Sequence, residues 1–109
     1  QNIQDWSFKE LLEDLGSHLP VWRTNAQDEL IRRGNQSLAI LEETIDKSKQ
    51  TKSLETWATW TIGRIKPNPN LPERTLNQKI QSIRIQAHNK KILMYLQKVQ
   101  LQKQAQIFL

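Results

Sequence analysis

The sequence contains no cysteine, only three glycines and four prolines, and no long apolar run. Without cysteine there is no disulfide framework, thiolate zinc site, cysteine nucleophile or haem attached through a Cys-x-x-Cys-His motif. So few glycines and prolines leave little turn chemistry for a many-stranded β-fold. No stretch approaches the ~20 consecutive apolar residues of a membrane-spanning helix, and residues 1–25 lack the basic and apolar regions of a signal peptide.

Acidic residues are missing from the last third of the chain. Residues 1–73 hold nine lysines and arginines together with all 11 acids, whereas residues 74–109 hold seven lysines and arginines and no acid. The formal net charge of +5 is therefore carried by the C-terminal part. Asymmetry of this kind indicates an anionic partner for that part.

The 109 residues amount to a single domain with a modest core. The chain begins at Gln1 without Met and ends on the apolar residues 107–109. We therefore expect residues 1–109 to be one helical domain cut from a longer protein. Its compartment stays open: cytoplasmic, or periplasmic if the parent protein is exported.

Apolar residues recur at helical spacing along most of the chain, so we expect an all-α fold. Ser7 and Glu10 have the spacing of a capping box at the start of a first helix, which Gly16 ends. Pro20 suits the first turn of a second helix. That helix ends in basic residues followed by Gly34, a favourable C-terminus.

Further helices are expected along the rest of the chain. Asn35 caps a third helix in this prediction, and Ser53 caps a fourth. Residues 66–72 contain three of the four prolines and interrupt the helices. Beyond them, residues 76–90 and 91–108 form either two helices or one long helix.

Three alanines mark a candidate internal repeat. Ala26, Ala58 and Ala87 lie 32 and 29 residues apart, each at mid-helix. A small residue there lets a partner helix approach closely, with large aliphatic residues one turn away filling the space between pairs. We expect a short α-solenoid of about three antiparallel helix pairs, near 7–34, 36–65 and 76–108. The last pair is irregular, because Lys91 occupies an aliphatic position of the repeat.

The segment 38–65 resembles a HEAT repeat of the kind also seen in phycobilisome-lyase-type proteins. Such repeats read as an apolar helix, a polar turn and a helix ending Ala-x-x-x-aliphatic-Gly-Arg-aliphatic. The matching residues here are Ala58, Ile62, Gly63, Arg64 and Ile65. Residues 11–34 are similar, with Val21, Arg23, Ala26 and Leu30 in the corresponding places. The resemblance covers about half of the chain and implies a non-catalytic scaffold that binds other protein segments.

A narrower resemblance concerns the second helix. Its matching residues are Trp22, Arg23, Ala26, Leu30, Arg33 and Gly34. They are similar to a HEAT-like segment in large exported dehydrogenase-like proteins of planctomycete-type bacteria, where it lies between a β-propeller and a c-type cytochrome domain. This resemblance implies an accessory domain of an exported multidomain oxidoreductase, with no electron-transfer chemistry in the present chain.

No catalytic or metal-binding motif is visible. His18 and His88 lie far apart without patterned carboxylates, whereas a metal site needs three or four convergent ligands. Adjacent carboxylates on a helix point ~100° apart and are expected on solvated faces. These pairs are Glu13-Asp14, Asp28-Glu29 and Glu42-Glu43. We expect no enzymatic activity, no cofactor, no metal and no small-molecule substrate.

The tryptophans are expected to pack rather than to bind. Trp57 and Trp60, three residues apart, are of a type favoured at binding hot spots. Helix pairs, however, need large residues to fill the space between them, so we expect both in the core. Trp6 precedes the first helix and is expected to cover its end as a hydrophobic staple.

Two candidate binding surfaces follow. The first, built from the second helix of each pair, would contact a protein segment or a neighbouring domain. It comprises Arg23, Asp28, Arg32, Glu55 and Arg64. The alternative is a nucleic-acid-binding surface made of the C-terminal cations Lys79, Arg84, Lys90, Lys91, Lys98 and Lys103. Phosphate binding uses cations clustered on one face, so a shared face would favour this alternative.

The apolar side of the last helical stretch is expected to be the last seam of the stack, or a surface for an absent neighbouring repeat. It carries Ile92, Leu93, Leu96 and Val99. Glutamines interrupt the apolar stripe beyond Leu101, so we do not expect a membrane-surface helix.

Overall fold

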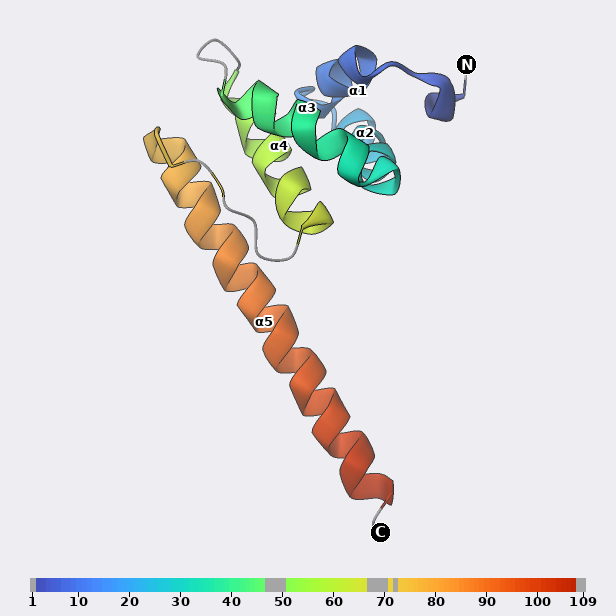
Figure 1. Ribbon diagram of the computed structural model, residues 1–109, viewed down its shortest axis with the longest axis vertical. Helices are drawn as coiled ribbons and strands as arrows, with labels where there is room; N and C mark the ends of the chain where they lie inside the picture. Colours follow the sequence, from blue (N-terminus) through green and yellow to red (C-terminus); the bar gives the residue numbers. More distant parts are fainter. Residues whose placement is uncertain (1, 47–50, 67–70, 72, 108–109) are drawn as a thin grey trace.

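The computed structural model describes residues 2–46, 51–66, 71 and 73–107, and within this part all regular structure is helical. The elements are η1 (Ile3–Asp5), α1 (Phe8–Leu15), α2 (Pro20–Arg33), α3 (Asn35–Asp46), α4 (Lys52–Ile65) and α5 (Leu76–Ile107). Figure 1 shows α1–α4 gathered at one end, with α5 running past α4 and away from the others. The prediction of an all-α fold is confirmed.

The first two helices begin and end where the sequence predicts. The Oγ atom of Ser7 accepts a hydrogen bond from the Glu10 N–H at 3.2 Å, and the Glu10 carboxylate accepts one from the Ser7 N–H at 3.1 Å. This capping box satisfies two N–H groups that the helix itself leaves unpaired. Gly16 ends α1, and Pro20 is the first residue of α2. Gly34 ends α2 at a φ of 66°, a left-handed conformation that glycine adopts without steric cost.

Two predicted caps are wrong. Helix α3 already includes Asn35, because the chain turns at Gly34 and enters the next helix at once. Helix α4 is capped by Thr51, whose hydroxyl accepts a hydrogen bond from the Leu54 N–H at 3.1 Å. Ser53 therefore lies inside the first turn. Thr51 precedes it by two residues and offers the same kind of oxygen.

The two C-terminal helical stretches form one helix. Helix α5 contains 32 residues, which at a rise of about 1.5 Å per residue gives a length of roughly 48 Å. Neither glycine nor proline interrupts it. The expected third pair near 76–108 is therefore a single helix. The proline-rich break falls largely on residues 67–70 and 72, outside the described residues.

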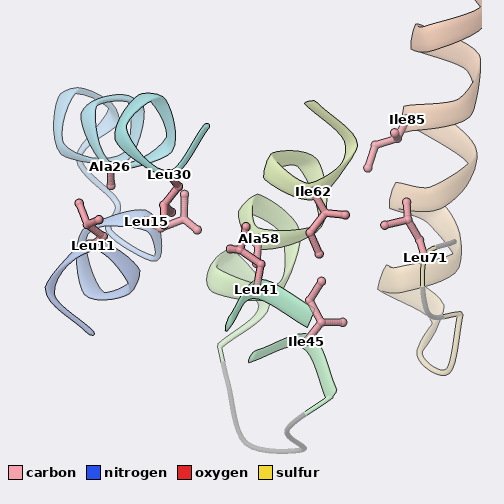
Figure 2. Close-up of a cluster of buried hydrophobic side chains, with 10 residues drawn as sticks. All are labelled: Leu11, Leu15, Ala26, Leu30, Leu41, Ile45, Ala58, Ile62, Leu71 and Ile85. Carbon is pink, nitrogen blue, oxygen red and sulfur yellow. The ribbon is translucent and has the colours of Figure 1, made fainter. Parts of the chain in front are cut away.

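The core follows the row of helices from α1 to α5. Its buried apolar residues are Leu11, Leu15, Ala26, Leu30, Leu41, Ile45, Ala58, Ile62, Leu71 and Ile85. Figure 2 shows them in three groups, between α1 and α2, between α3 and α4, and towards α5. Trp6, Trp57 and Trp60 are partly buried and pack against this core, as predicted for Trp57 and Trp60.

The three repeat alanines do not have equivalent environments. Ala26 and Ala58 are fully buried, whereas Ala87 is exposed. Residue 87 lies about 200° around the helix from the buried Ile85, so it points away from α4. The sequence match at Ala87 therefore has no counterpart in the packing.

Candidate interaction surfaces

Helices α2 and α4 contact each other through polar and aromatic side chains. The guanidinium carbon of Arg23 lies 4.1 Å from the centroid of the Trp57 ring, a cation–π contact. Gln27, which is buried, donates to the Thr61 hydroxyl at 3.3 Å and accepts from Arg64 at 3.0 Å. Residue numbers rise together along both helices in these contacts, so α2 and α4 run in the same direction.

The predicted protein-binding surface is divided. The Arg64 guanidinium lies 4.0 Å from the Asp28 carboxylate, and both side chains are more than half exposed, so these two residues lie together. Arg23 instead contacts the Trp57 ring. Arg32 is held by a neighbour on its own helix. Glu55 faces the start of α5 instead, where its carboxylate accepts hydrogen bonds from Thr75, just before the helix, and from Asn77 in its first turn. The five residues therefore do not form one continuous surface.

Glu29 was expected on a solvated face, and this expectation is wrong. The residue is only 5% exposed, and its carboxylate accepts hydrogen bonds from Arg32 at 2.7 and 2.6 Å and from Arg33 at 2.7 Å. These hydrogen bonds, that from Arg32 above all, lower the pKa of Glu29 from 4.5 to about 2, although desolvation by burial acts in the opposite direction. Its neighbour Asp28 stays exposed.

Arg33 connects α2 to the chain before α1. Its guanidinium donates to the carbonyl oxygens of Gln4 at 3.2 Å and Trp6 at 2.8 Å, and it lies 4.9 Å from the centroid of the Phe8 ring. With Glu29 on its other side, Arg33 holds the N-terminal segment against α2. Sequence reasoning missed this role, since no local pattern relates Arg33 to residues about thirty positions earlier.

A hollow of about 780 Å³ opens beside this cluster. It is lined by Ile3, Trp6, Asp14, Trp22, Asn25, Asp28, Glu29 and Arg32. The indole nitrogen of Trp6 is buried and has no hydrogen-bond partner among the described residues. Trp22 is 53% exposed, and with Ile3 and Trp6 it gives the hollow an apolar wall beside both acidic and basic side chains.

Helix α5 packs on α4 through its first half. The indole N–H of Trp60 donates to the Gln81 side chain at 2.8 Å, and its ring lies 5.8 Å from that of His88 in an edge-on arrangement. Gly63 lies against Ile85 further along. Since the residue numbers again rise together, α4 and α5 also run in the same direction.

The apolar side of α5 continues beyond α4. A hollow of about 480 Å³ between the two helices is lined in part by Ile92, Leu93 and Leu96. These three side chains are 46–56% exposed. The side that buries Ile85 therefore continues along α5 as a partly exposed apolar strip.

The C-terminal cations share a side of α5. At about 100° per residue, five of them fall within an arc of roughly 140° that faces away from Ile85. They are Lys79, Arg84, Lys90, Lys91 and Lys98, all exposed. Lys103 is also exposed but lies at the same angle as Ile85. In the described part of the chain, Arg74 pairs with Asp46 and none of these six forms an ion pair.

Within the described part of the chain, the remaining titratable residues form no metal-binding cluster. His18 lies exposed in the turn before α2, and His88 is exposed on α5. Across residues 2–46, 51–66, 71 and 73–107, no group of three or more His, Asp or Glu side chains is placed to hold a metal ion. None of the described helices has the length and apolarity needed to cross a membrane.

No protein-family model, curated protein or solved structure matches this chain. The resemblance to HEAT repeats therefore stays a prediction that depends on the residues quoted for it.

Proposed function

We propose that this chain is a non-catalytic helical scaffold that binds another protein, or a neighbouring domain of its parent protein, through α5. The observation that carries the proposal is the exposure of apolar residues along the second half of this helix. Met94, Tyr95, Leu96 and Leu101 are each 56–66% exposed. A helix that is apolar on several sides is normally buried in its functional state.

The packing of the other helices supports a short α-solenoid of the HEAT type. Helix α1 packs on α2 and α3 on α4, while α2, α4 and the first half of α5 lie in a row and run in the same direction. In a solenoid each repeat buries its apolar side against the next one. On this proposal α5 ends the row and offers its uncovered sides to the partner.

The surface predicted on α2 and α4 is the weaker candidate. Arg23 stacks on Trp57, and Arg64 is bound to Gln27, so both side chains already have partners within the chain. Polar groups that are satisfied internally gain little from a second partner. We therefore assign the principal contact to α5.

Thiol protection tests the proposal, because the chain has no cysteine of its own. Met94→Cys places a thiol on the exposed side of α5, and Glu42→Cys places the matched control on the exposed side of α3. In the purified protein both thiols react at similar rates with a maleimide. In an extract of the cells that make the protein, only Met94→Cys is expected to be protected, and nuclease is expected to leave that protection intact. Equal labelling of both variants in the extract would overturn the proposal.

Nucleic-acid binding is the second candidate, and the shared side of the five C-terminal cations favours it. Phosphate contacts release counterions, so binding must weaken steeply between roughly 50 and 200 mM salt. Labelled single- and double-stranded oligonucleotides test this directly. Tight binding that disappears at the higher salt, and with Lys91→Gln and Lys98→Gln, would place this function first. Failure to bind at either salt would remove it.

A further inference from the structure

The exposed side of α5 carries a heptad repeat. Ile80, Ala87, Met94 and Leu101 follow one another at intervals of seven residues, and all four are exposed. Residues at this spacing form a stripe along a helix, as the a positions of a coiled coil do. Here the stripe lies on the side opposite to Ile85, which packs on α4.

The positions beside the stripe are basic. Counting Ile80 as position a, Arg84, Lys91 and Lys98 occupy three successive e positions, and Lys79 occupies a g position. Residues 74–109 contain no acid that could neutralise them. The e and g positions select the partner of a coiled coil through interhelical charge pairs.

The d positions divide the helix into two parts. Leu76 and Ile83 are apolar and exposed, as an ordinary seam requires. The d positions that follow are Lys90, Gln97 and Gln104, so beyond residue 90 the stripe is apolar at its a positions only. A charged residue at one such position fixes the register of a coiled coil, because only one alignment gives it a partner of opposite charge. A helix that pairs with α5 must therefore bring an acidic side chain to Lys90.

Three other occupants fit less well. A second copy in parallel would place Arg84 opposite Lys79 and Lys90 opposite its own counterpart, and an antiparallel copy would place the basic e positions opposite one another. Both arrangements bring cations together, which is unfavourable. A phosphate backbone would satisfy the cations but leave Met94 and Leu101 in water. A helix lying on an anionic membrane needs one apolar and one polar side. Helix α5 instead is apolar on two opposite sides, one of them already packed on α4.

We propose that the heptad face of α5 forms a coiled coil with an acidic amphipathic helix. This partner helix presents apolar residues to Ile80, Ala87, Met94 and Leu101 and carboxylates to the flanking cations. The proposal rests on the proposed scaffold function and specifies the chemistry of the partner. It accounts together for the apolar stripe, the basic flanks and the absence of acids.

A pair of designed peptides provides the probe. Both have four heptads with identical apolar a and d residues, apart from a Glu at the position that faces Lys90. One carries Glu at every e and g position, and the other carries Lys. Fluorescence anisotropy of the labelled peptides with the full chain is expected to show binding of the Glu peptide only. This binding should weaken at higher salt without disappearing, because the apolar contacts remain.

Charge reversal provides the decisive variant. In the triple variant Arg84→Glu, Lys91→Glu, Lys98→Glu, we expect the Glu peptide to bind at least about tenfold more weakly and the Lys peptide to gain affinity. All three positions are exposed, so the fold is expected to be unaffected. If both peptides bind the original and reversed chains equally, the proposal is overturned.

Serine substitutions of apolar residues test which of the two sides of α5 binds the peptide. Met94→Ser, on the heptad face, is expected to weaken binding of the Glu peptide, whereas Leu96→Ser, on the side that continues from Ile85, is expected to leave it unchanged. The two side chains are similarly exposed, at 58% and 56%. Equal effects of the two substitutions would contradict the assignment of the heptad face.

The remaining outcomes distinguish this inference from the proposed function. If the Glu peptide fails to bind while Met94→Cys is protected in the extract, the scaffold function stands and the acidic helix is overturned. If phosphatidylserine vesicles or duplex DNA bind and the Glu peptide does not, the face belongs to an anionic surface instead. Absence of both peptide binding and thiol protection would remove both proposals.

Discussion

Gly63 on α4 lies directly against Ile85 on α5: a Cβ atom built at residue 63 would lie 2.7 Å from the Cγ2 atom of Ile85. Real Cβ atoms do not approach other atoms so closely. Ile85 is β-branched, and its χ1 angle has little freedom in a helix. The close approach of α5 to α4 therefore depends on the missing side chain at residue 63.

Gly63→Ala is expected to destabilise the protein. Overpacking destabilises a protein by about 1–3 kcal/mol, whereas the higher helix propensity of alanine over glycine stabilises it by about 1 kcal/mol. We expect a net loss of about 1 kcal/mol in the free energy of unfolding, measured with urea. A double-mutant cycle with Ile85→Ala is expected to show favourable coupling, since removing the methyl group makes room for the new one. Strictly additive effects would show that the two residues are not in contact.

The Glu29 cluster predicts an effect of pH on stability. The pKa of Glu29 is about 2 in the folded protein, below its ordinary value of 4.5. The ionised carboxylate therefore stabilises the fold above about pH 4.5, and this contribution is lost as the pH falls towards 2. Glu29→Gln is expected to be less stable than the original chain at pH 7, with the difference shrinking below pH 4.5. A difference in urea midpoint that is independent of pH would contradict this.

Two substitutions of Trp6 are expected to differ in their effect on stability. Its indole nitrogen has no partner among the described residues, so Trp6→Phe removes no hydrogen bond and is expected to cost no more than about 1 kcal/mol. Trp6→Ala also removes the ring that packs against the core, at an expected cost of about 2–3 kcal/mol. Thermal unfolding of both variants measures the difference. A loss for Trp6→Phe well above about 1 kcal/mol would contradict the lack of a partner for the indole N–H, and equal losses would contradict a contribution from ring packing.

Hydrogen exchange along α5 is expected to be uneven. Residues 77–89 contact α4, whereas residues 97–105 are mostly exposed and lie beyond the hollow that α5 forms with α4. Helices without tertiary support open readily. We expect amides of residues 97–105 to exchange at least roughly tenfold faster than those of residues 77–89 in the purified protein. Uniform protection would show that α5 is stable without a partner.

Local signals in the sequence predicted the helix ends well. The Ser7–Glu10 capping box and the glycine after α2 act on atoms only a few residues away, so the spacing of residues in the sequence is enough to predict them. Asn35 and Ser53 failed as caps because a neighbouring residue, Gly34 or Thr51, already set the boundary.

Contacts between distant residues could not be read in this way. The burial of Glu29 depends on two arginines and on the N-terminal segment that Arg33 holds, some thirty residues earlier. The exposure of Ala87 depends on the angle at which α5 meets α4. Both are consequences of packing rather than of local composition.

The heptad stripe lies between these cases. The spacing of Ile80, Ala87, Met94 and Leu101 is present in the sequence, yet it defines a face only if residues 76–107 form one helix. With two helices left as an alternative, the stripe had no fixed geometry. For the same reason, the sequence alone could not show that the five cations share one side, since their angles can be compared only along a single helix.

Photo-crosslinking at Met94 tests most directly whether α5 is a surface for another protein. Met94→p-benzoylphenylalanine, made in the cells that produce the protein, would be irradiated beside a matched variant at Glu42. We predict a discrete adduct at residue 94 that protease removes and nuclease does not, with no such adduct at residue 42. Adducts at neither position, or an adduct at residue 94 that nuclease removes, would contradict the account.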